Sequence, residues 1–148
     1  MGIKKKYIII SFFVCFIAAT AIGYYFYNDE GVNIETAKAV AADATVLYDT
    51  FIKDPVAAKK HYAGKIVAVS GEVEQVSANQ QQQPVVLLKT DTDGAAVNCT
   101  FEGMTGNVKI GDKTIIKGIC TGLGEGDAEL GIPGDVYLTR CYITKQDQ

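Results

Sequence analysis

The sequence predicts a small, closed, all-β barrel of five strands, preceded by short α-helices and by an N-terminal transmembrane helix. The first observation behind this prediction is an uncharged run at 7–27, directly after three lysines at 4–6. The second is that apolar and polar residues alternate with a period of two from residue 65 onward, as in half-buried strands. The third is the number of such stretches, because five strands suit a small barrel better than a sandwich, which has about seven.

The uncharged run, 7–27, is long enough to cross a bilayer. As a helix it would measure about 31 Å, which matches the hydrocarbon core. The tripeptide Ala19-Thr20-Ala21 also fits the cleavage site of a secretory signal, which remains an alternative. Cys15 follows bulky residues in the middle of the run, which disfavours a lipoprotein signal. Because the aromatic residues at 24–27 suit a membrane interface, we expect a signal-anchor.

The basic leader, 1–6, sets the expected topology. Positive residues tend to remain on the cytoplasmic side, so we expect residues 28–148 on the extracytoplasmic (periplasmic) side of the cell membrane. Without the three leader lysines, 11 basic residues stand against 17 acidic ones, a net charge near −6. Such a balance opposes nucleic-acid binding, which relies on lysine and arginine to neutralise phosphates.

A helical segment at 36–63 is expected after a linker at 28–35. The alanine-rich residues 36–52 have apolar side chains at helical spacings and predict a first helix. Asp54-Pro55 is typical of an N-cap followed by proline at the first helical position, and predicts a second helix that ends at Gly64.

The barrel is expected over 64–145, and its first strand begins at Lys65. The residues on one face of this strand are Val67, Val69 and Val73. Gly71 predicts a bulge or a bend, as in a long strand that serves both halves of a small barrel. A polar loop is expected at 77–83.

Four further strands are expected, at 85–89, 97–102, 114–120 and 136–144. The turn at 91–94 joins the first two of them into a hairpin. A glycine-containing connection precedes the third, and we expect the glycine-rich stretch 121–135 before the last strand to contain a flexible loop. A bent first strand followed by strands in this order predicts an OB-fold.

An ordered series of short motifs runs through the helical segment and the barrel. They are Leu47-Tyr48-x-x-Phe51, Tyr62-x-Gly64-Lys65, Val69-x-Gly71-x-Val73, Val85-x-Leu87, Cys99-x-Phe101, Gly118-x-Cys120-x-Gly122 and Asp135-Val136-x-Leu138-x-x-Cys141. The series resembles the tRNA-anti-like family of bacterial OB-fold domains, which often carry an N-terminal anchor or a lipoprotein signal. The resemblance covers about 42–144 and implies the fold, but no established activity.

Ligands of OB-folds usually bind between the loop that joins strands one and two and the loop that joins strands four and five. The candidate binding residues in these loops are Gln80, Gln81, Gln82, Gln83, Glu125, Asp127 and Glu129. Tyr137 and Tyr142, on the last strand, are interpreted as packing residues. We therefore expect a binding module for an envelope protein or a saccharide.

A domain for single-stranded nucleic acid, similar to an anticodon-binding domain, is the alternative. Such domains combine a basic groove with stacked aromatic side chains. Strands two and three offer only Lys89 and Phe101 for these roles, and Phe101 shares a face with core residues. We therefore consider nucleic acid the weaker hypothesis.

The catalytic and metal-binding patterns in the sequence are incomplete. His61 is the sole histidine and has no cysteine or serine partner at a motif spacing. Asp91-x-Asp93-Gly94 lacks the later ligands of a calcium loop, and 122–126 lacks the third glycine of a phosphate-binding loop. We expect no enzymatic activity, no metal and no cofactor.

Three cysteines lie outside the apolar run, namely Cys99, Cys120 and Cys141. The expected compartment permits disulfides. Strands three and five of an OB barrel are parallel neighbours, so a disulfide between Cys99 and Cys141 is one hypothesis. The other is that all three stay reduced and pack as small apolar residues.

Overall fold

The computed structural model describes residues 2–27 and 33–144 and divides the chain into two compact units, 1–33 and 34–148. The first unit contains helix α1 (Gly2–Tyr27). Among the described residues, this is the one helix that is long and apolar enough to cross a membrane, over Tyr7–Tyr25. Its length and composition are compatible with the predicted membrane anchor.

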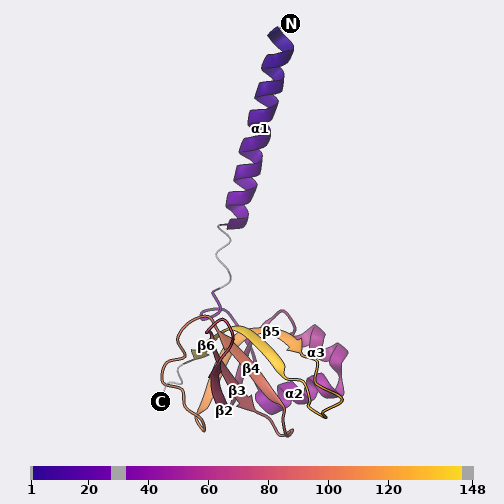
Figure 1. Ribbon diagram of the computed structural model, residues 1–148, viewed down its shortest axis with the longest axis vertical. Helices are drawn as coiled ribbons and strands as arrows, with labels where there is room; N and C mark the ends of the chain where they lie inside the picture. Colours follow the sequence, from indigo (N-terminus) through magenta and orange to yellow (C-terminus); the bar gives the residue numbers. More distant parts are fainter. Residues whose placement is uncertain (1, 28–32, 145–148) are drawn as a thin grey trace. The chain divides into compact units, whose positions relative to one another are not determined.

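The second unit is a closed five-stranded barrel with OB topology, as predicted (Figure 1). Its strands are β2 (Ile66–Ala78), β3 (Pro84–Lys89), β4 (Ala96–Phe101), β5 (Lys113–Leu123) and β6 (Val136–Thr144). They follow the order β2-β3-β4-β6-β5, and β5 pairs back with β2 to close the barrel. Only the β4–β6 pairing among these five is parallel, which places the loops 102–112 and 124–135 at opposite ends.

Strand β2 serves both halves of the barrel. Its first part pairs with β5 as far as Glu72, and its second part pairs with β3 from Val73 onward. The irregularity in pairing falls between Val73 and Gln75, so the bulge predicted at Gly71 is misplaced. Gly71 instead permits close packing, because a Cβ atom there would lie 3.1 Å from Ala44 Cβ. The strand also continues to Ala78, into the loop predicted at 77–83.

The helix predicted over 36–52 is wrong in its first half. Val40–Asp43 form strand β1, which pairs in parallel with β2 from Val67 to Ser70. Because β3 begins to pair with β2 only at Val73, this part of β2 would otherwise present an open edge. Tertiary pairing therefore overrides the helical preference of the alanines.

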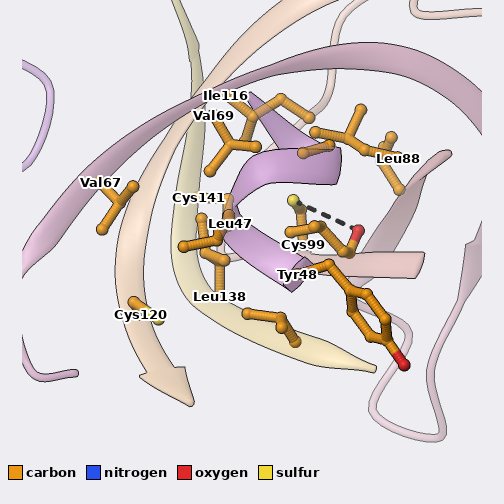
Figure 2. Close-up of a cluster of buried hydrophobic side chains, with 14 of the residues drawn as sticks. Leu47, Tyr48, Val67, Val69, Leu88, Cys99, Ile116, Cys120, Leu138 and Cys141 are labelled. Carbon is orange, nitrogen blue, oxygen red and sulfur yellow. Dashed lines mark hydrogen bonds between the residues drawn. The ribbon is translucent and has the colours of Figure 1, made fainter. Parts of the chain in front are cut away.

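Helix α2 (Ala44–Lys53) closes one end of the barrel and contacts all six strands. It begins at Asp43, whose Oδ1 accepts a hydrogen bond of 2.9 Å from the Thr45 amide. Its buried face carries Leu47, Tyr48 and Phe51. Figure 2 shows Leu47 and Tyr48 among inward-facing side chains of the strands. Burial of each large apolar side chain of this kind contributes roughly 1.5–3 kcal/mol.

Helix α3 (Pro55–Tyr62) confirms the predicted second helix. Asp54 Oδ1 accepts a hydrogen bond of 3.0 Å from the Ala57 amide, and Pro55 occupies the first turn. Gly64, at φ +74°, lies just after the helix. The ring of Tyr62 lies 6.2 Å from that of Phe51, so α3 packs against α2 through an aromatic pair.

Candidate functional site

The outer face of the barrel presents one row of side chains across four neighbouring strands. Gln75 pairs with Leu87, Leu87 with Asn98, and Asn98 with Tyr137. Residues on either side of Asn98 and Tyr137 are buried, so these two side chains point outward. Tyr137 is 40% exposed, so its ring is only partly packed. The row holds one aromatic ring and no positive charge.

The glutamine loop lies beyond one end of this face and is organised by Asn79. Asn79 Oδ1 accepts hydrogen bonds from the amides of Gln81 (3.0 Å) and Gln83 (2.9 Å), and its Nδ2 donates to Gln83 Oε1 (2.9 Å). Gln83 is therefore engaged in the turn. The side chains of 80–82 are exposed.

The loop at the other end of the face, 124–135, is an ordered hairpin rather than a flexible loop. The amides of Asp127 and Ile132 each donate to the carbonyl of the other residue, both at 2.8 Å. Gly124 N donates to Asp135 O at 2.8 Å. Asp127 Oδ1 also accepts from two amides of the turn, at 129 and 130, both at 3.0 Å. The Asp127 carboxylate therefore stabilises its own loop.

Three glycines of this hairpin are required by close backbone contacts. A Cβ atom at Gly126 would overlap the carbonyl oxygen of Ile132, and one at Gly134 would overlap that of Gly124. A Cβ atom at Gly124 would overlap the Tyr137 ring. These positions need glycine for space, which explains why a glycine-rich stretch is rigid here.

Asp135 fixes the hairpin to the barrel, a role that the sequence reasoning missed. Its Oδ1 accepts a hydrogen bond of 2.9 Å from the Ala96 amide at the start of β4. Burial, followed by the charges of Asp135 and Asp49, raises the pKa of Tyr48. The sequence signal for this role was the position of Asp135 directly before a strand. An aspartate there can accept a hydrogen bond from the backbone amide at the end of a neighbouring strand.

A pocket of about 340 Å³, here called the Tyr137 pocket, lies between the hairpin and the β3–β4 turn. Its polar and aromatic lining residues are Glu125, Asp127, Asp135 and Tyr137. The structure thus brings together two of the predicted binding residues, Glu125 and Asp127. Glu129 and the glutamines at 80–83 do not line this pocket.

The chemistry of the Tyr137 pocket is that of hydrogen-bond acceptors beside an aromatic ring. Carboxylates accept hydrogen bonds from hydroxyl and amide groups, and an aromatic face contacts apolar ligand surfaces. Within the described residues, no three histidine, cysteine or carboxylate side chains are grouped so that they could hold a metal ion. His61 is exposed and lies edge-on against Tyr62, 4.8 Å between ring centres.

The three cysteines of the barrel are buried free thiols (Figure 2). Contact with the Cys141 thiol, then burial, raises the pKa of the Cys99 thiol, and burial raises that of Cys120. Gly118 leaves space for the Cys141 thiol, because a Cβ atom at Gly118 would lie 2.6 Å from Cys141 Sγ.

The predicted disulfide partners are neighbours, but they are not opposite each other. Cys141 pairs with Phe101, and Cys99 with Leu138. All three cysteines are free thiols in the structure, as the reduced alternative expects, and the disulfide stays a prediction.

A family model described as tRNA_anti-like matches residues 1–130, which includes α1 as well as the barrel through β5. No curated protein matches the chain.

Proposed function

Since the chain belongs to the tRNA-anti-like family and folds as an OB barrel, we propose that it is a membrane-anchored binding module for a saccharide of the bacterial envelope. In this proposal α1 is a single-pass anchor with its N-terminus in the cytoplasm, and the barrel works on the extracytoplasmic side. The protein binds its ligand and performs no chemical step.

The Tyr137 pocket carries this proposal. A partly exposed tyrosine ring faces a pocket that is also lined by Glu125, Asp127 and Asp135. A sugar ring offers an apolar face to an aromatic ring and hydroxyl groups to carboxylates. The volume of about 340 Å³ lies at the small end of the range for ligand pockets, which suits a short saccharide. OB-folds bind oligosaccharides and oligonucleotides near this same loop.

The same pocket disfavours nucleic acid. Phosphate groups would approach Glu125, Asp127 and Asp135, and repulsion between like charges would oppose binding. Among the outward residues of β3, Lys89 supplies a single cation, which is far short of a basic groove. The acidic balance of residues 28–148 acts in the same direction.

The anchor and its orientation rest on the first unit and the leader. Helix α1 contains an apolar stretch of 19 residues, which spans a bilayer at about 1.5 Å per residue. The lysines at 4–6 favour a cytoplasmic N-terminus. A phosphatase that folds only outside the cytoplasm, fused after residue 148, would be active in this topology and inactive in the reverse one.

The ligand is tested with the full chain in detergent micelles. Tri-N-acetylchitotriose serves as a probe for amino-sugar glycans, and its affinity is measured by calorimetry. Tyr137→Ala should weaken binding by about tenfold, equivalent to about 1.4 kcal/mol. Tyr142→Ala is the matched control, because it removes a 37% exposed tyrosine from the same strand outside the pocket, and it should leave affinity unchanged.

Two results would contradict the saccharide proposal. One is absence of binding to the amino-sugar probe and to a neutral glucose oligomer. The other is binding of a single-stranded oligonucleotide that falls steeply with salt, which would establish the nucleic-acid alternative.

A further inference from the structure

The end of the barrel opposite α2 holds a second and larger pocket, of about 610 Å³. It lies under the loop 102–112 and is called the 102–112 pocket below. Its apolar lining residues are Phe101, Met104, Val108, Cys141, Tyr142 and Ile143. A closing helix fills the other end, whereas a loop alone connects β4 to β5 here. The volume is well within the range of ligand sites.

This pocket combines a buried apolar floor with an exposed apolar rim. Phe101 and Cys141 at the floor are only 2% and 1% exposed, while Met104 at the rim is 95% exposed. Ile110, in the same loop, is 69% exposed. A loop that presents large apolar side chains to water beside an apolar cavity is typical of a surface that meets an apolar partner.

The charged residues that line the pocket are one lysine, Lys113, and one aspartate, Asp112. Within the described residues, Lys113 Nζ makes neither a hydrogen bond nor an ion pair, although Glu72 is opposite it in register. Asp112 lines the pocket too, but its Oδ2 accepts a hydrogen bond of 2.9 Å from the Lys109 amide. Lys113 is thus an available cation beside a space that suits a hydrocarbon chain.

The pocket shares its strands with the segment through which the chain enters the barrel. Lys117 lies on β5, three residues after Thr114, which lines the pocket. Its Nζ donates to the carbonyls of Glu35 (3.0 Å) and Ala37 (2.9 Å). Its register partner on β6 is Tyr142, which lines the pocket. Residues 34–37 directly follow the stretch that leads from α1. The pocket therefore lies on strands that also hold the entry of the tether.

From these observations we propose that the 102–112 pocket binds an acyl chain of an anionic membrane phospholipid. The chain occupies the cavity above Phe101, and Lys113 faces the phosphate of the headgroup. Met104 and Ile110 contact the bilayer interface. This inference rests on the proposed membrane anchoring, and it is independent of the saccharide site at the opposite end of the barrel.

The test uses the full chain in phosphatidylcholine nanodiscs that contain a few per cent of a phosphatidylglycerol analogue. The analogue carries a photoreactive diazirine near the end of one acyl chain. After illumination, digestion and mass spectrometry, labelled peptides are expected from α1 and also from 101–114 and 141–144. A matching phosphatidylcholine analogue should label the barrel several-fold less.

Rim variants preserve the fold and sharpen the test. Met104→Glu should reduce labelling of the barrel by about tenfold, and Lys113→Ser should abolish the preference for the anionic analogue. Leu130→Glu is the matched control, because Leu130 is also highly exposed, at 72%, but lies in the other loop. It should leave labelling unchanged.

The outcomes separate this inference from the anchoring on which it rests. Labelling of α1 without labelling of the barrel overturns the pocket proposal and leaves the anchor standing. Absence of label from both overturns both. Loss of barrel labelling when free palmitate is added, with palmitate itself bound in the absence of lipid, contradicts a phospholipid source.

Discussion

The two ends of the barrel are closed in different ways. At one end, α2 inserts Leu47 and Phe51 and the hairpin 124–135 is held by backbone hydrogen bonds. At the other end, the loop 102–112 leaves Met104 and Ile110 in solvent above an apolar cavity. The first end is fixed by interior packing and can present a shaped polar pocket. The second has apolar surface in excess of what the fold requires.

The largest difference between the ends is expected for truncation of apolar side chains. Phe51→Ala removes a ring that is 1% exposed and should lower the free energy of unfolding by about 3–5 kcal/mol. Met104→Ala, at the other end, should change it by less than about 0.5 kcal/mol. Urea unfolding of the full chain in micelles, followed by tyrosine fluorescence, measures both. Equal losses would show that the loop 102–112 packs as tightly as α2.

Glycine substitutions compare the connecting loops. Gly134→Ala places a methyl group against the Gly124 carbonyl and should destabilise the protein by about 1–3 kcal/mol. Gly103→Ala places it in open space at an ordinary φ and should be nearly neutral. The same unfolding measurement applies. A neutral Gly134→Ala would mean that the hairpin 124–135 is as mobile as its composition indicates.

Carboxylate caps give the next comparison. Asp135→Ala leaves the amide of Ala96, a buried residue, without its acceptor and should cost about 1–3 kcal/mol. Asp112→Ala removes an acceptor from the exposed Lys109 amide, which water can replace, and should cost less than about 1 kcal/mol. Hydrogen exchange at the Ala96 amide should accelerate in the first variant only. Unchanged exchange there would contradict the role assigned to Asp135.

The smallest effect is expected from the thiols between the ends. The pKa of Cys99 is raised in the folded state above an ordinary value of 9.0, so its neutral form is preferred on folding. Below about pH 9 this stabilisation is complete, and it is lost as the pH rises through the folded-state pKa, because the unfolded thiol releases its proton first. Stability should therefore decline above pH 9. The decline should be shallower in Cys99→Ala, and identical slopes would contradict the assignment.

The strands were predictable because each is a short apolar or alternating stretch bounded by glycine, proline or polar residues. Val67, Val69 and Val73 were predicted to share one face of the first strand, and all three are buried. Strand β1 was not predictable, because its sequence, Val-Ala-Ala-Asp, has no strand character of its own. It forms because the first part of β2 pairs with β5 on one side only and leaves its other side open. That open edge is a property of the assembled sheet.

The candidate site was predictable in part. Loop position indicated Glu125 and Asp127, since OB-folds use this region. The sequence did not reveal that glycines of the same loop provide space for backbone contacts, because glycine is found both where a chain is mobile and where it is crowded. The outward direction of Tyr137 follows from the alternation of its own strand, because Val136 and Leu138 on either side are buried. Its place opposite Asn98 depends on the pairing of β4 and β6, which the sequence does not show.

The hydrogen bonds of Lys117 also have a mechanical consequence. A pull that arrives through residue 34 meets β5, a strand paired on one side with β2 and on the other with β6. A strand held along both edges must shear many hydrogen bonds together, whereas an edge strand peels one bond at a time. The carbonyls of Glu35 and Ala37 would therefore detach from Lys117 before β5 separates from its two neighbours.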